Sequence, residues 1–96
     1  MLPKNRRPTH PGEVLLEGFL KPMNLSQASL ASHLGWPYAR VNEIVKEKRG
    51  ITPETALAFS DSFGTTAEFW LNLQLYFDLW AASMDHQRFG RIRKSA

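Results

Sequence analysis

The segment YARVNE, residues 38–43, brings together hydrogen-bonding side chains of several chemical types. The Arg40 guanidinium can donate two parallel hydrogen bonds to guanine, and the Asn42 amide can both donate to and accept from adenine. The Glu43 carboxylate can accept from the amino group of cytosine, and the Ala39 methyl can contact the methyl of thymine. The residues that could contact DNA bases are therefore Tyr38, Ala39, Arg40, Asn42 and Glu43.

Apolar residues in the same region indicate which element presents these groups. Val41, Ile44 and Val45 recur at the spacing of one helix face, so residues 37–47 are predicted to form a helix that buries this stripe. The polar side chains then lie on the opposite face, which a DNA major groove can accept. Two alternatives remain open: this face simply contacts solvent, and Tyr38 packs beside Val41 instead of facing outward.

A second group of residues is suited to phosphate, which positions a helix on DNA without reading the sequence. Two of them begin the preceding predicted helix, where free backbone N–H groups favour an anion. The others are basic residues beyond the opposite end. The candidate phosphate contacts are Ser26, Gln27, Lys46, Lys48 and Arg49. In the alternative interpretation, Lys48 and Arg49 only stabilise the C-terminal end of a helix dipole.

The two helices that carry these groups, residues 26–34 and 37–47, are joined by the short turn LGWP. Gly35 can reverse the chain in a left-handed conformation, and Pro37 suits the first position of a new helix. A tight connection followed by a short, polar-faced helix is typical of a helix-turn-helix. An ordinary helical hairpin in a small bundle is the alternative.

Three further helices complete an all-α, five-helix prediction without strands. The first spans residues 11–21, and the fourth spans residues 53–63. The fifth is predicted to begin with a capping box formed by Thr65 and Glu68, and to continue to about residue 84.

The fifth predicted helix is more apolar than a helix with one buried face needs to be. One core cannot bury both its aromatic stripe and the leucines on its other side. The helix is therefore expected to form a two-fold interface between protomers. A central helix of the monomer is the alternative. The candidate dimer-interface residues are Phe69, Trp70, Leu73, Tyr76, Phe77 and Trp80.

Composition places the chain among globular proteins with one domain, predicted over residues 11–85 between a flexible basic arm at 1–10 and a basic tail at 86–96. The 96 residues include no cysteine, which excludes disulfides and thiolate metal sites. The sequence has no apolar run long enough to cross a membrane and no secretory signal, so a reducing cytoplasm is expected. His10, His33 and His86 are scattered, and neither a catalytic site, a metal site nor a cofactor is expected.

Charge is distributed unevenly along the chain. Residues 1–50 carry eight Lys and Arg against four Asp and Glu, whereas residues 51–85 carry five acids and no Lys or Arg. Residues 86–96 carry four basic residues and no acid. An acidic middle between basic ends suggests two surfaces with two partners, unless the charges only keep the surface hydrated.

Three stretches resemble one family: HPGE at residues 10–13, VNEIVKEKRGITPETAL at 41–57 and EFWLNLQ at 68–74. They are similar to HigA/VapI-type antitoxins of the Xre, or lambda-repressor-like, helix-turn-helix group, and the resemblance covers residues 9–82. In two departures from the pattern, Trp36 replaces a smaller aliphatic residue and Glu47 occupies a position that usually has glycine.

The resemblance implies a homodimer that binds double-stranded operator DNA and represses its own operon. It also implies a HigB-type toxin partner, an RNase that cleaves mRNA, and a phosphate contact for Gln27. The toxin is hypothesised to bind away from residues 37–47, on residues 10–17 and the acidic half. Alternatives are a solitary Xre-type regulator without a toxin, a protein that binds partners but not DNA, and an enzyme such as a nuclease.

Overall fold

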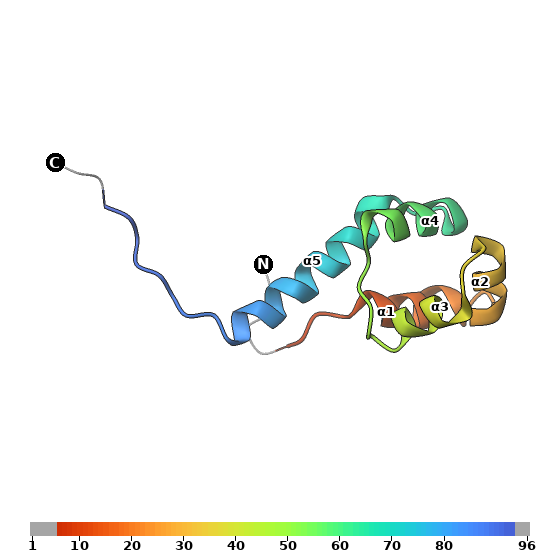
Figure 1. Cartoon of the computed structure of the whole chain (residues 1–96), viewed down its shortest axis with the longest axis horizontal. Coiled ribbons are helices and arrows are strands. Elements are labelled where there is room, and N and C mark those ends of the chain that lie inside the picture. The colour runs from red at the N-terminus through yellow and green to blue at the C-terminus, as the bar shows by residue number, and fades with distance from the viewer. Residues whose placement is uncertain (1–5, 94–96) are drawn as a thin grey trace.

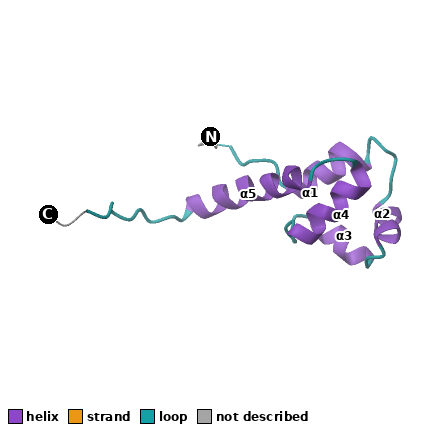
Figure 2. Cartoon of the chain, turned by 90° about the horizontal axis from the view of Figure 1, so that it is seen from above, coloured by secondary structure: helices purple, strands orange, loops and turns teal. Residues whose placement is uncertain are grey.

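The computed structural model describes residues 6–93, and all of its regular structure within that range is helical. Figure 1 shows a body built from α1 to α4 and the start of α5, with the rest of α5 projecting away from it. Figure 2, seen from above, shows the same projection and the extended tail that follows it. The predicted all-α, five-helix architecture is confirmed.

The first predicted helix forms, but in two parts. α1 (Pro11–Glu13) continues directly into a π-helical segment, η1 (Val14–Leu20). His10 caps α1, because its Nδ1 accepts the backbone N–H of Gly12 at 2.9 Å. His10 is itself buried, so the body of the protein begins within the segment that was predicted to be a flexible arm. Residues 1–5 of that arm, and Lys94 in the tail, lie outside the described residues.

The second and third helices are α2 (Gln27–Leu34) and α3 (Tyr38–Val45). Ser26 caps α2, since its Oγ accepts the backbone N–H of Ser29 at 3.0 Å. Pro37 is the N-cap of α3 in extended conformation, and not its first helical residue as predicted. α3 also ends earlier than predicted.

The last two helices are α4 (Pro53–Phe63) and α5 (Ala67–Met84). The predicted capping box of Thr65 and Glu68 is wrong by one residue, because Thr66 Oγ1 accepts the N–H of Phe69 at 3.0 Å. Thr65 Oγ1 instead accepts the indole N–H of Trp70 at 2.7 Å. That bond satisfies the polar atom of a buried aromatic side chain.

The core lies where α4 and the start of α5 meet the first three helices. Trp70 and Phe59 are fully buried and touch edge to face, with ring centroids 4.9 Å apart. Trp70 was predicted at the dimer interface, and that assignment is wrong because no part of its side chain is exposed in the protomer. The core residues are Leu15, Leu20, Leu30, Ala31, Val41, Ile44, Ile51, Ala56, Phe59 and Trp70.

The HPGE stretch packs tightly against α3 at Gly12. A β-carbon added at Gly12 would overlap the backbone carbonyl oxygen of Ile44, so only glycine fits there. Because Ile44 lies in α3, this contact sets the position of the helix that carries the candidate base-contacting residues.

Candidate nucleic-acid interface

α2, the turn after it and α3 form the predicted helix-turn-helix. Gly35 ends α2 in the left-handed conformation, with a φ of 69°, and the chain reverses there. α3 turns Val41 and Ile44 into the core. Tyr38 is 53% exposed, and Ala39 beside it is also exposed, so the start of α3 faces outward.

Two of the predicted contact residues bind one another. The Asn42 amide nitrogen donates to Gln27 Oε1 at 3.0 Å, which joins a candidate base contact on α3 to a candidate phosphate contact on α2. The pair fixes the direction in which each amide presents its remaining hydrogen-bonding atoms. Glu43, by contrast, forms an ion pair with Arg49 at 2.8 Å beyond the end of α3.

Arg40 does not lie on the outward face that the sequence predicted for it. Its guanidinium carbon is 3.7 Å from the centroid of the Trp36 ring, and its Nη2 donates to Glu54 of α4 at 2.8 Å. The side chain is only 23% exposed. The structure thus differs from the outward direction expected for Arg40, because the side chain is directed at α4, which competes for its hydrogen bonds; a base contact by Arg40 stays a prediction.

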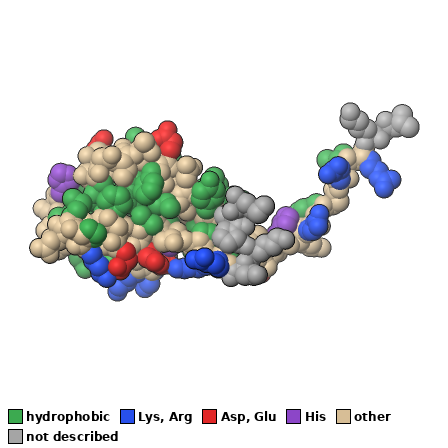
Figure 3. Space-filling model, turned by 180° about the vertical axis from the view of Figure 1, so that it is seen from behind, with side chains coloured by type: hydrophobic (Ala, Val, Ile, Leu, Met, Phe, Trp, Pro, Cys, Tyr) green, Lys and Arg blue, Asp and Glu red, His purple; other side chains and the backbone are tan. Residues whose placement is uncertain are grey.

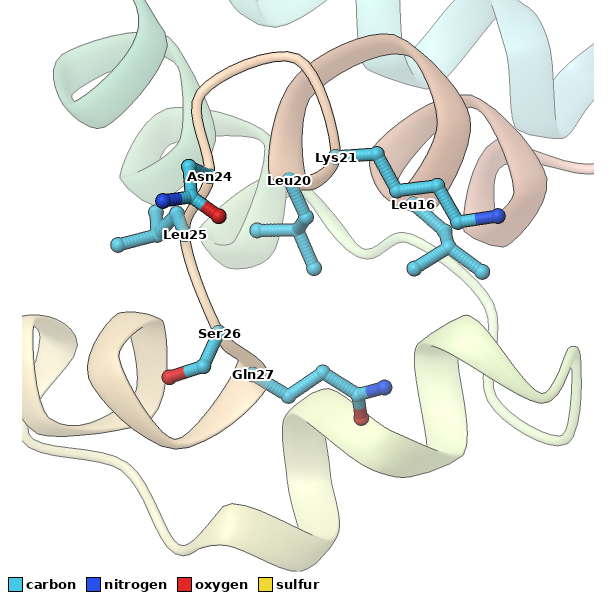
Figure 4. A pocket seen from close by; sticks show the side chains of 7 residues that line it. All are labelled: Leu16, Leu20, Lys21, Asn24, Leu25, Ser26 and Gln27. Atoms are coloured by element: carbon cyan, nitrogen blue, oxygen red, sulfur yellow. The ribbon is translucent and has the colours of Figure 1, made fainter.

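The candidate phosphate contacts gather at two places. Figure 4 shows Ser26 and Gln27 at the start of α2, on one side of a pocket whose other side includes Leu16, Leu20 and Lys21. The second place is the loop that follows α3, where Lys46 and Lys48 are exposed and Arg49 is held by Glu43.

The loop after α3 is held in place by Gln74 of α5, a residue that was not among the predicted site residues. Gln74 of α5 accepts the backbone N–H of Ile51 at 2.7 Å through its Oε1. A β-carbon added at Gly50 would stand 2.9 Å from the same oxygen, so the loop passes close to the amide. The only signal in the sequence was the position of Gln74 at the end of EFWLNLQ.

The same loop is tied to the start of the chain. Arg7 forms an ion pair with Glu47 at 2.9 Å and lies 5.2 Å from the centroid of the Phe77 ring on α5. The hydrogen bond from Arg7 lowers the pKa of the Glu47 carboxyl. Glu47 adopts a φ of 64°, which explains why glycine suits this position.

The sequence of this chain is similar to those of known helix-turn-helix proteins. A family model described as helix-turn-helix matches residues 16–70 of the chain. Virulence-associated protein I of Dichelobacter nodosus is 51% identical to it, over 93% of this chain and 83% of that protein. Antitoxin HigA-1 of Vibrio cholerae is 33% identical, over 93% of this chain and 84% of that protein. The chain belongs to the HigA-type helix-turn-helix family.

A solved structure agrees with this assignment. The Pseudomonas aeruginosa antitoxin HigA, determined with the higBA promoter, superposes on the chain with a TM-score of 0.79 at 42% identity. The match covers 81% of this chain and 85% of that one. The resemblance that the sequence motifs indicated is thus confirmed, and the relative determined with promoter DNA has the same helical fold.

In this HigA-type chain the exposed apolar side of α5 differs from the predicted set. Leu73 packs against the core, and Phe77 packs edge to face on His10 with ring centroids 4.7 Å apart. Leu75, Tyr76 and Leu79 are each about half exposed and share one helix face. The two leucines were missed because the sequence alone does not show which of two apolar stripes turns to the core.

Charged groups of opposite sign lie close together in this HigA-type chain, as in the ion pairs of Arg7 with Glu47 and of Arg49 with Glu43. Figure 3 shows Lys and Arg side chains along the lower edge of the body with Asp and Glu side chains among them, and apolar side chains across the middle of that view. Acidic residues of the second half are exposed, but Glu54 lies against α3 through Arg40. Within residues 6–93, no three histidine or carboxylate side chains come together as metal ligands would. No helix in the described part is long and apolar enough to span a membrane.

Proposed function

We propose that this protein is the antitoxin of a HigBA-like pair, which binds operator DNA as a homodimer, represses its own operon and neutralises an mRNA-cleaving HigB-type toxin. The observation that carries the DNA-binding part is the outward start of α3 beside the N-terminus of α2, with Gln27 and Asn42 joined between them. The family membership and the promoter-bound relative support the same conclusion.

The bases are contacted mainly by Tyr38, Ala39 and Asn42, which are exposed or partly exposed on α3. Arg40 is left out of this set because its side chain is directed at α4. Lys46 and Lys48 supply positive charge next to them and bind phosphate. Several such contacts displace counterions, so affinity for DNA falls steeply as salt rises.

The DNA-binding part is tested by titrating the DNA upstream of the gene, and a scrambled duplex of equal length, at two salt concentrations. Tyr38→Ala is expected to weaken binding to the upstream DNA alone, by about 1–3 kcal/mol. Lys46→Ala should weaken binding to both duplexes alike, and Ser32→Ala, an exposed change on α2, is the matched control. Wild-type protein that binds neither duplex at low salt would exclude the regulator function.

Toxin neutralisation rests on the acidic surface and on the start of the first helix. Glu13 and Glu17 are exposed there, and so are Asp61 at the end of α4 and Glu68 in the first turn of α5. A basic RNase-like protein would be attracted to such a surface, which speeds encounter and excludes wrong partners. Glu54 pairs with Arg40 beside α3, and Glu17 pairs with Lys21 at 2.7 Å, so Asp61 and Glu68 contribute most of the negative charge.

Co-expression with the neighbouring gene product tests this part. A complex that still binds the upstream DNA is expected, and the pair Asp61→Lys with Glu68→Lys should slow association while the fold is retained. DNA binding without any toxin complex would instead identify a solitary regulator. A complex in which toxin and DNA strictly exclude each other would contradict the separate toxin surface.

A further inference from the structure

One side chain joins the start of α3 to the start of α4. The Arg40 guanidinium lies on the Trp36 ring and donates both to Glu54 Oε1, at 2.8 Å, and to Thr55 Oγ1, at 3.3 Å. Its Nε is buried and has no hydrogen-bond partner in the described structure. Two hydrogen bonds from Nη2 to neighbouring residues of α4 and the stacking on Trp36 therefore hold the guanidinium in one place.

These contacts oppose a role in reading bases. To reach a guanine, Arg40 would have to leave an aromatic ring, a carboxylate and a hydroxyl, and so exchange existing interactions for new ones. A cation stacked on tryptophan is stabilised by the negative face of the ring, and the charges of both partners strengthen the single hydrogen bond from Arg40 to Glu54.

The carboxylate in this cluster has a consequence for DNA binding. Glu54 is in the first turn of α4, and its side chain is 78% exposed although it contacts the start of α3. A free negative charge at this position would repel the phosphates of a duplex bound by α3. The Arg40 charge cancels it at a distance of 2.8 Å.

We infer that Arg40, from its place between α3 and α4, neutralises Glu54 beside the DNA and does not contact a base. The inference rests on the proposed DNA binding. It assigns sequence discrimination to the neighbours of Arg40 on α3. It also gives Trp36, which departs from the family pattern, the role of a platform for the guanidinium.

Three variants test the inference: Arg40→Met, Glu54→Gln and the two together. Methionine keeps an unbranched apolar stem over Trp36 but removes the charge, and the double variant restores the net charge of the wild type. Dissociation constants are measured for the upstream DNA and for a scrambled duplex at two salt concentrations. Thermal unfolding of each variant confirms that it is folded at the assay temperature.

Arg40→Met is expected to weaken binding to both duplexes by the same factor, on the order of threefold, because the exposed Glu54 carboxylate loses its counter-charge. Glu54→Gln should strengthen both by a similar factor and make binding more sensitive to salt, because it leaves an uncompensated cation. In the double variant, affinity and salt dependence should return close to the wild-type values. A purely structural role for Arg40 would not be restored by a change at Glu54.

The inference is overturned if Arg40→Met lowers the preference for upstream over scrambled DNA and Glu54→Gln fails to restore it, since Arg40 then reads a base. An unchanged affinity in Arg40→Met would overturn it as well. Wild-type protein that binds neither duplex would instead defeat the proposed function, and the inference with it. The two failures are distinguished by the wild-type titration alone.

Discussion

At the scale of single residues, Glu47 combines an unfavourable backbone conformation with a favourable ion pair. Its φ of 64° lies in the left-handed region, where a residue with a β-carbon is less stable than glycine by about 1–2 kcal/mol. The partner, Arg7, is half exposed, so the pair adds little stability in water.

We therefore predict that Glu47→Gly leaves the free energy of unfolding unchanged or raises it, although the ion pair is lost. Glu47→Gln is the matched control, because it loses the same ion pair but keeps the left-handed β-carbon. Chemical denaturation should show the glycine variant to be more stable than the glutamine variant by about 1 kcal/mol. Equal stability of the two variants would show that the backbone at this position is not strained.

A second residue, His10, can cap α1 only as a neutral imidazole, because Nδ1 must accept the N–H of Gly12. Burial lowers the pKa of His10 from its ordinary value of 6.5 by disfavouring the charged ring. The unfolded chain thus takes up a proton near pH 6.5 that the folded protein resists. The contribution of His10 to stability is complete above that pH and is lost as the pH falls below it, towards the folded-state pKa.

The lowered pKa of His10 predicts that the protein loses stability as the pH falls. The wild-type unfolding temperature should fall between about pH 7 and about pH 5, in the range where histidine titrates. His10→Asn, whose side chain can cap the helix without titrating, should show a shallower fall over the same range. His33→Asn, at an exposed position, should retain the wild-type slope. Parallel slopes for all three proteins would exclude His10 as the titrating group.

At the scale of elements, the contact between α1 and α3 depends on the missing side chain of Gly12. Gly12→Ala is predicted to lower the free energy of unfolding by about 1–3 kcal/mol, because the new methyl meets the Ile44 backbone, which cannot rotate away. Gly18→Ala is the control, since its β-carbon would only touch Val14 Cγ1 at 3.8 Å. Chemical denaturation checks the difference, and similar losses in both variants would contradict the close contact.

At the scale of the whole molecule, the projecting half of α5 leaves Leu75, Tyr76 and Leu79 half exposed. We predict a homodimer through this face, which would place the α3 helices of the two protomers about 34 Å apart on a palindromic DNA site. Leu79→Glu should give a monomer in sedimentation at tens of micromolar, because the dimer interface would have to bury an unpaired carboxylate. Ala81→Glu, exposed on another side of α5, should remain dimeric. A wild-type monomer that still binds a palindrome tightly would refute this assembly.

The sequence by itself determined the helices and their order, because the signals for them are local. Each signal acts within a few residues of the helix that it defines. Examples are the N-caps Ser26 and Thr52, the left-handed Gly35 and Gly64, and the spacing of Val41 and Ile44. The motif resemblance also identified the family, since HPGE and EFWLNLQ are specific patterns. The physical reason for HPGE is tertiary, because Gly12 packs against the Ile44 backbone of α3.

Only the tertiary structure decided which way several side chains turn. The direction of Arg40 depends on Glu54, fourteen residues later, and the loop after α3 depends on Gln74, which is twenty-three residues from Ile51. For the same reason Trp70 lies in the core although it was predicted at the interface, and Leu75 and Leu79 are exposed although they were not predicted there. A helix with apolar residues on two sides has no preferred orientation until the other helices cover one of them, and burial of the larger aromatic surface then decides the outcome.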